Sequence, residues 1–158
     1  MNTAPSDVEG LGNSRKPSNP VSDWRVHSVS ITAPAKPRSV GLLRSHVSVL
    51  FTGWVMTTDE QETAALVISE LLTNAVRHGR EEMTLLVARS GSTLDITVVD
   101  HGAMQATAAV SDRDEHGRGL AIVAAVTREL CIEESAMGWR TFARMDLDRS
   151  CPAQGCTV

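Results

Sequence analysis

The stretch from Ile68 to Gly79, ISELLTNAVRHG, constrains the fold most, because it combines an apolar helix face with four polar side chains. At about 100° of rotation per residue, a set of apolar positions falls on one side of a helix. These positions are Ala64, Ile68, Leu71, Leu72 and Ala75. Glu70, Asn74 and His78 follow at four-residue steps on the adjoining side, with Arg77 close by. The stretch therefore predicts a core helix whose polar edge can present a base and a metal ligand.

Composition excludes several classes of protein. The 158 residues predict one domain, and a hydrophobic content of 42% suffices for a packed core. The net charge of -4, without a block of like charge, argues against direct contact with nucleic acid or an anionic membrane. With two Phe, three Trp and no Tyr, a base-stacking platform is also not expected.

The missing apolar segments and the small number of cysteines indicate the cellular compartment and argue against structural disulfides. No apolar run approaches the ~20 residues of a membrane span, and no secretory segment is seen, so we expect a cytoplasmic protein. Three cysteines, Cys131, Cys151 and Cys156, are too few and odd in number for a disulfide framework. Cys151 and Cys156 have no second pair that would complete a zinc site.

The chain divides into a tail over residues 1–22, a domain over 23–147 and a second tail over 148–158. Within the domain, hydrophobic periodicity predicts the following elements. They are a strand over 24–31 with a possible bulge, helices over 37–51 and 58–78, a hairpin of strands 83–89 and 94–99, a loop over 103–116, an apolar helix after Gly119, and a hairpin of strands 132–135 and 139–147. Thr58 with Gln61 has the spacing of a capping box for the second helix. In the third helix, Leu120, Val123, Val126 and Leu130 are predicted to face the core.

Hairpins combined with helices predict an α+β fold. We expect a two-layer sandwich, with one mixed, mostly antiparallel sheet and three helices on one face. The strict strand-helix alternation of a doubly wound fold is missing, and so are the P-loop and the dinucleotide fingerprint.

Two further clusters, beside the helical one, can carry chemistry. Asp100 with Gly102 at the end of an apolar strand is either a simple turn or a pocket-floor carboxylate that accepts a hydrogen bond from an exocyclic amine. Gly117-Arg118-Gly119-Leu120 opens an apolar helix, where free backbone N–H groups can bind phosphate. For the helical cluster the alternative is a solvated polar face, although the poor helix propensity of Asn74 argues against it.

In this order, the clusters resemble the GHKL family of ATP-binding domains, which includes gyrase, chaperone, histidine-kinase and mismatch-repair ATPases. SELLTNAVRHG, residues 69–79, is similar to the family's asparagine box. HGRGLAIV, residues 116–123, is similar to its second glycine box, and VVDHG, residues 98–102, to the start of the first. The resemblance covers about Trp24 to Leu147 and is closest to the anti-sigma-factor serine kinases and small ATP-binding regulators of actinobacteria. It implies a Bergerat-type ATP-binding fold.

The resemblance also implies roles for the residues of the first box. Glu70 would be the general base that polarises the attacking hydroxyl group. Asn74 would be a ligand of Mg²⁺, which bridges the nucleotide phosphates. Arg77 and His78 would line the ATP pocket or contact phosphate.

The two glycine boxes would hold the rest of the nucleotide. Asp100 would bind the adenine amine with support from Thr141, and Gly102 would let the base lie against the strand end. The backbone of the second box would meet the phosphates at the helix start. Its residues are Gly117, Arg118, Gly119 and Leu120. Residues 103–116 would form the lid over the site.

Two functions follow from the resemblance. The first is an ATP-dependent serine/threonine kinase, acting as a homodimer, that sequesters a sigma factor and phosphorylates a STAS-type anti-anti-sigma protein. The second is a non-catalytic ATP-binding regulator, which is suggested because Met104 stands where the first glycine box usually has its second glycine. The catalytic domain of a histidine kinase is disfavoured, because no helix with a phospho-accepting His precedes the domain.

Overall fold

The computed structural model describes residues 26–77, 81–101, 116–135 and 138–148. Within these residues the chain forms five strands and three helices. In chain order they are β1 (Val26–Pro34), α1 (Pro37–Gly53), α2 (Thr58–Arg77), β2 (Glu82–Ser90), β3 (Thr93–His101), α3 (His116–Val126), β4 (Glu129–Ser135) and β5 (Gly138–Asp146). The predicted order of elements is thus confirmed.

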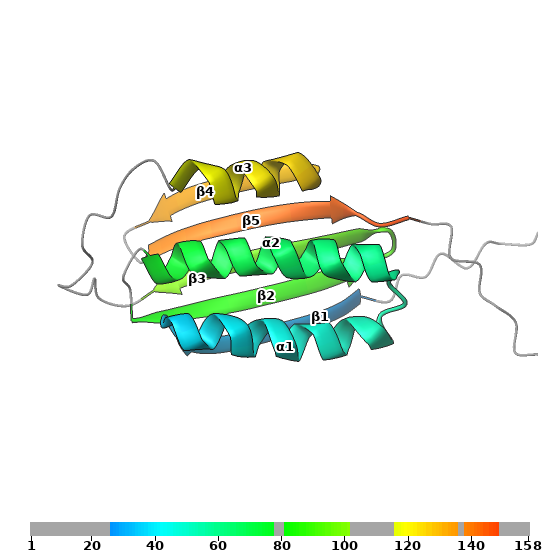
Figure 1. Ribbon diagram of the computed structural model, residues 1–158, viewed down its shortest axis with the longest axis horizontal. Helices are drawn as coiled ribbons and strands as arrows, with labels where there is room; N and C mark the ends of the chain where they lie inside the picture. Colours follow the sequence, from blue (N-terminus) through cyan, green and yellow to red (C-terminus); the bar gives the residue numbers. More distant parts are fainter. Residues whose placement is uncertain (1–25, 78–80, 102–115, 136–137, 149–158) are drawn as a thin grey trace, which may run out of the picture.

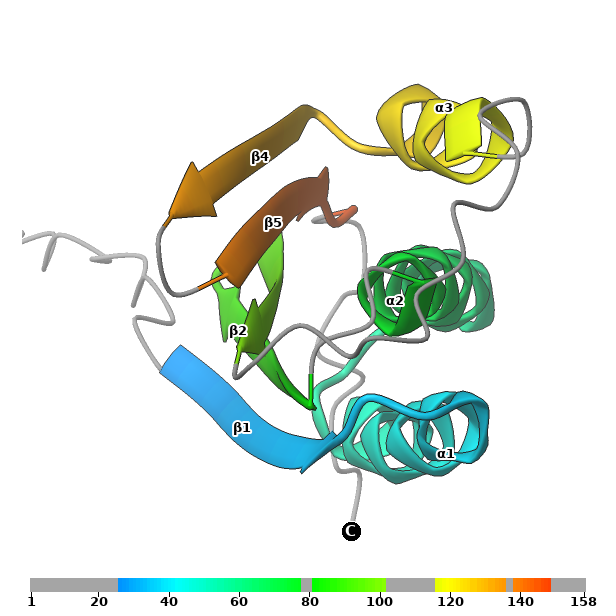
Figure 2. The ribbon, with the colours of Figure 1, turned by 90° about the vertical axis from the view of Figure 1, so that its left-hand side faces the viewer.

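The described strands form one sheet in the order β1-β2-β3-β5-β4. Its four pairings are all antiparallel, so the sheet is more regular than the mixed sheet that we expected. Figures 1 and 2 show the helices on one face of the sheet, with α2 between α1 and α3. The two-layer α+β prediction is confirmed, and the architecture is consistent with the Bergerat fold.

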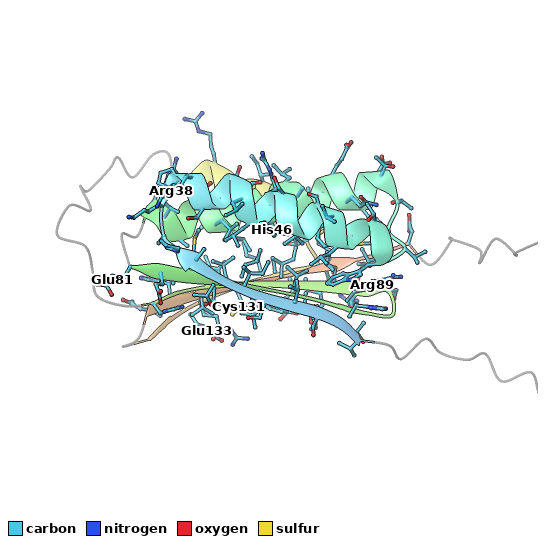
Figure 3. All side chains as sticks on the ribbon, turned by 90° about the horizontal axis from the view of Figure 1, so that it is seen from below. Arg38, His46, Glu81, Arg89, Cys131 and Glu133 are labelled. Carbon is cyan, nitrogen blue, oxygen red and sulfur yellow. The ribbon has the colours of Figure 1, made fainter. Side chains whose placement is uncertain are left out.

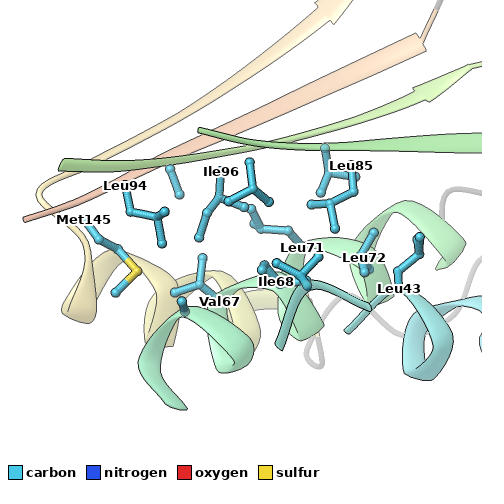
Figure 4. Close-up of a cluster of buried hydrophobic side chains, with 14 of the residues drawn as sticks. Leu43, Val67, Ile68, Leu71, Leu72, Leu85, Leu94, Ile96 and Met145 are labelled. Atoms are coloured by element: carbon cyan, nitrogen blue, oxygen red, sulfur yellow. The ribbon is translucent and has the colours of Figure 1, made fainter. Parts of the chain in front are cut away.

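The core lies between the sheet and the central helix (Figure 4). The five apolar positions predicted for α2 are all buried, and Val67 joins them. They pack against the alternate residues of β2 and β3 that point toward the helices. These residues are Met83, Leu85, Val87, Leu94, Ile96 and Val98. Removing one such large side chain typically costs about 2–5 kcal/mol of stability, so this contact orients α2 firmly.

Strand β1 differs from the sequence prediction. A possible bulge was expected, because the apolar positions shift phase between Val26 and Val29. The structure pairs β1 with β2 residue for residue, from Val26 opposite Ser90 to Pro34 opposite Glu82. Val26 simply lies on the open face, where 63% of its surface is exposed, so no extra residue is needed.

The end of α3 also differs from the prediction. Leu130 was expected on the helix, but α3 ends at Val126, and Leu130 lies in β4 opposite Ala143. Leu130 still packs against the core, because alternate β4 residues point toward the helices. Val126 is 39% exposed, whereas Val123 is fully buried. An apolar residue shortly after the end of a helix can fit both the helical period and the alternation of the following strand. The sequence pattern alone therefore did not show that α3 ends before Leu130.

The first turn of α2 carries a capping box at a different position from the predicted one. The Thr57 backbone N–H donates to Glu60 Oε2 at 2.7 Å, and the Glu60 N–H donates to Thr57 Oγ1 at 3.3 Å. Glu60 Oε1 also accepts the Asp148 N–H at 2.7 Å. Thr57 is therefore the N-cap in place of Thr58, and Glu60 ties the start of α2 to the chain that follows β5.

The other face of the sheet is not covered by the described helices (Figure 3), and it carries a group of paired charges. Arg144 of β5 makes two hydrogen bonds to Asp95 of β3, at 2.7 and 2.9 Å, and lies 3.5 Å from Glu129 of β4. These carboxylates raise the pKa of the Arg144 guanidinium, with the Asp95 hydrogen bond as the largest cause. The charges follow the strand register and thus join three neighbouring strands.

Several predictions lie outside the described residues. They concern most of the two tails, the loop over 103–115 with Met104, and the site residues His78 and Gly102. Cys151 and Cys156 also lie there. In the described part, no helix is long and apolar enough to cross a membrane.

The capping box predicts the effect of replacing Thr57. Thr57→Ala is expected to lower the free energy of unfolding by about 1 kcal/mol, because the Glu60 N–H loses its acceptor. Thr58→Ala is the matched control and should change it by less than about 0.5 kcal/mol. Urea unfolding followed by circular dichroism measures both variants. A larger loss for Thr58→Ala would contradict this assignment of the cap.

Candidate functional site

The polar edge of α2 runs toward the end of the helix that lies beside the start of α3 (Figure 1). Glu70 and Asn74 are half-buried, whereas Arg77 in the last turn is exposed. Because the apolar face of α2 packs on the sheet, the adjoining polar edge faces the space between α2, α3 and the strand ends. The predicted helical wheel is thus confirmed, with Glu70 and Asn74 in a sheltered position.

Glu70 lies against the first turn of α3. A Cβ atom built onto Gly119 would overlap Glu70 Oε2, so glycine is what lets the carboxylate approach the α3 backbone this closely. The N-terminal turn of a helix carries free N–H groups and partial positive charge, which favour an anion. The structure therefore brings the first predicted cluster into contact with the third.

A shallow, tightly lined cleft lies between α2 and the ends of β3 and β5, with about 160 Å³ of empty space that is partly open to solvent. Asn74 and Ala75 of α2 line it on the helix side, and the end of β3 and the start of β5 line it on the sheet side. The strand residues are Val98, Asp100, Trp139 and Thr141. Three predicted site residues from three separate elements, Asn74, Asp100 and Thr141, thus meet in one cleft.

Asp100 is the most unusual residue of the cleft, because its carboxylate is buried, with 1% of the residue exposed. Its Oδ1 accepts the backbone N–H of Trp139 at 2.5 Å. Its Oδ2 is also buried but has no hydrogen-bond partner among the described residues. A buried carboxylate oxygen without a donor is costly, so this atom indicates a site for a ligand that donates a hydrogen bond. The simple-turn alternative does not account for it.

Gly138 is a residue whose importance the sequence did not reveal, since it reads only as a hairpin turn. Its φ is +143°, a value that L side chains rarely adopt. A Cβ at this position would collide with the Asp100 carbonyl group and would lie 2.9 Å from Asp100 Oδ1. The first residue of β5 thus lies directly against the end of β3, and the next residue, Trp139, donates its N–H to the Asp100 carboxylate. In the sequence, only the pair Met137-Gly138 before Trp139 could have indicated this role of Gly138.

The second glycine box forms the first turn of α3, as predicted. Arg118 is exposed, and Leu120 is half-buried and packs against the core. Gly119 places backbone without a side chain beside Glu70, and Gly117 lies in the same helical turn. Leu120 thus anchors the helix start, and the glycines leave its N–H groups accessible to an anion.

The donors present suit a nucleotide with its metal better than a metal held by protein alone. The described residues contain no group of three or more His, Cys, Asp or Glu that could hold an ion. Mg²⁺ usually takes one or two protein ligands and completes its shell with phosphates and water. The Asn74 amide oxygen, beside the cleft, is a suitable single ligand of this kind.

Sequence comparison agrees with this geometry. Residues 33–144, more than half of the chain, match the family model described as a histidine kinase-like ATPase domain. The chain belongs to this family. Membership of the histidine kinase-like ATPase domain family implies that the domain binds ATP, and it confirms the resemblance drawn from the three boxes. No curated protein matches the chain significantly.

A solved structure shares the fold of this ATPase domain. It is the crystal structure of the RsbU and RsbW domains of Rv1364c from Mycobacterium tuberculosis, with a TM-score of 0.62 and 22% sequence identity. The match covers 83% of this chain and 35% of that chain, so this chain spans about a third of its length. At this identity the likeness supports the fold alone.

The contact between Gly138 and Asp100 gives a test of the site's architecture. Gly138→Ala is expected to lower the free energy of unfolding by about 1–3 kcal/mol, because it strains the backbone and pushes the start of β5 away from Asp100. Gly41→Ala is the control, since Gly41 lies in α1 with open space around it. This control should raise stability by about 0.5–1 kcal/mol. Thermal and urea unfolding measure both, and equal stability of the two variants would contradict the close contact.

Proposed function

We propose that the protein is an ATP-dependent serine/threonine kinase that sequesters a sigma factor and phosphorylates a STAS-type anti-anti-sigma partner. The family membership supports ATP as the ligand. The observation that carries the proposal is the buried Asp100 Oδ2, which lacks a partner among the described residues and faces a cleft shared with Asn74. It is the acceptor that the exocyclic amine of adenine requires.

Each part of the nucleotide then has a place. The adenine amine donates to Asp100 Oδ2, and Thr141 forms the adjoining wall of the cleft. The phosphates extend from the cleft toward the first turn of α3, where Gly117 and Gly119 leave the backbone N–H groups accessible. Asn74 lies on this path and would hold Mg²⁺, which neutralises phosphate charge when bound.

Glu70 would then act as the general base. Its carboxylate is half-buried and lies at the α3 start, next to the region assigned to the phosphates. It would take the proton of a serine hydroxyl as the serine oxygen bonds to the γ-phosphorus. The bond from the γ-phosphorus to its bridging oxygen breaks, and ADP leaves. Because Glu70 is repelled by phosphate, it must turn away from Gly119 when ATP binds.

The partners rest on the resemblance to anti-sigma-factor serine kinases, and so does the proposed homodimer. Net charge and composition favour protein partners over nucleic acid or membrane. A second candidate function is a non-catalytic regulator, in which bound ATP only changes a protein interface. It is favoured by Met104 in the first glycine box and by the position of Glu70 against α3.

ATP binding is tested at Asp100. Asp100→Asn is expected to weaken Mg-ATP binding about tenfold or more, because a hydrogen bond to a charged acceptor contributes about 1.5–3 kcal/mol. Isothermal titration calorimetry measures the affinity. Glu62→Gln, on the exposed side of α2, is a charge-matched control and should bind like the wild type. Failure of the wild-type protein to bind Mg-ATP would rule out both candidate functions.

Kinase activity is tested at Glu70. Glu70→Gln keeps the shape of the side chain but removes the base, so phosphate transfer should fall about 10²–10⁴-fold while Mg-ATP affinity does not fall. The assay incubates radiolabelled ATP with STAS-domain proteins encoded near the gene, with Glu62→Gln as control. Mg-ATP binding without any Glu70-dependent phosphoprotein would favour the non-catalytic regulator.

A further inference from the structure

Trp139 holds an unusual position, because it both lines the cleft and contacts the buried carboxylate of Asp100. Its N–H donates to Asp100 Oδ1 at 2.5 Å, which orients the carboxylate. The residue is also one of the six that line the cleft. Any ligand that reaches Asp100 Oδ2 must therefore lie next to Trp139.

Strand alternation shows which way the indole points. Thr141, Ala143 and Met145 of β5 are all buried beneath the helices. Trp139 occupies the same phase of the strand, two residues before Thr141, so its side chain extends toward the helix layer. It is half-buried and lies opposite Glu134 of β4, which is exposed. The half-buried Trp139 thus lines the cleft at the first residues of β5.

We propose that the Trp139 indole is the aromatic wall against which the base of the bound nucleotide packs. Asp100 Oδ2 then reads the edge of the base, and Trp139 contacts its face. The two contacts come from one unit, because the hydrogen bond that orients Asp100 also holds the Trp139 backbone beside it. A flat ring with only two side-chain torsions suits this task at little entropic cost.

The composition of the chain alone does not suggest an aromatic residue in a base-binding role. With few aromatic residues, the chain was not expected to stack a base at all. One of its three Trp residues nevertheless lies in the cleft. Trp54 lies after α1, toward the opposite end of the domain, where it contacts Phe51 and His27 at ring-centroid distances of 5.8 and 6.0 Å. Trp54 therefore stabilises the fold, whereas Trp139 is the described tryptophan that lines the cleft.

The inference rests on the proposed ATP binding and is tested with a matched pair of variants. Trp139→Phe keeps an aromatic ring, and Trp139→Leu keeps only apolar volume. Both retain the backbone N–H to Asp100. Base stacking on an aromatic residue contributes enough that the Leu variant should bind Mg-ATP about tenfold or more weakly. The Phe variant should stay within about threefold of the wild type.

Two further readouts separate stacking from a structural role. Wild-type tryptophan fluorescence should change when Mg-ATP saturates the site, and the change should be lost in Trp139→Phe. Binding of tripolyphosphate, which has no base, should be equal in the wild type and in Trp139→Leu. Calorimetry and fluorescence titration measure these quantities, and circular dichroism checks folding.

The outcomes distinguish the two proposals. A wild-type protein that does not bind Mg-ATP overturns the proposed function and this inference together. If the wild type binds Mg-ATP without a fluorescence change from Trp139, the inference alone fails. It also fails if the Leu variant binds Mg-ATP as well as the Phe variant does. Should the Leu variant not fold, the fluorescence difference between the wild type and Trp139→Phe decides.

Discussion

The packing of α2 on the sheet is the contact on which the rest of the structure depends. Its apolar face is buried against alternate residues of β2 and β3, and α1 and α3 pack on either side of it. A helix held along its whole length has no freedom to rotate. Its polar edge is therefore held in one direction, so the contact that stabilises the core also presents Asn74 to the cleft and Glu70 to the first turn of α3.

Two features give the site its binding properties. One is a buried polar group without a hydrogen-bond partner among the described residues, and the other is glycine at positions where a side chain would not fit. Asp100 is buried with one oxygen without a partner in the described residues, which costs stability in the absence of a ligand. Gly119 and Gly138 remove side chains where carboxylates approach the backbone closely. A carboxylate acceptor and an amide thus share one cleft, and the start of α3 lies against Glu70, one helical turn before Asn74. An unsatisfied buried carboxylate beside an amide is an arrangement that nucleotide binding explains and that packing alone does not.

Local patterns were sufficient for most of the fold. The period of 3.6 in α2 and the period of two in β2 and β3 are direct consequences of backbone geometry, so the buried faces could be predicted. The errors lie at element ends. Thr57 and Thr58 are equally good caps by composition, and only the reach of Glu60 to Thr57 and Asp148 selects the first. Leu130 satisfied the helix pattern by coincidence, because its strand also faces the core.

The sequence by itself determined the amphipathic helix, the order of the elements and the three boxes, because each depends on residues close together in the chain. Tertiary structure decided which of these residues meet. Asp100 is far in sequence from the adjacent residues Gly138 and Trp139, and only the pairing of β3 with β5 brings them together. The role of Trp139 could not be read from the sequence for the same reason. The position of Trp139 in the cleft depends on its hydrogen bond to Asp100 in β3, and no pattern of neighbouring residues in the sequence predicts such a contact.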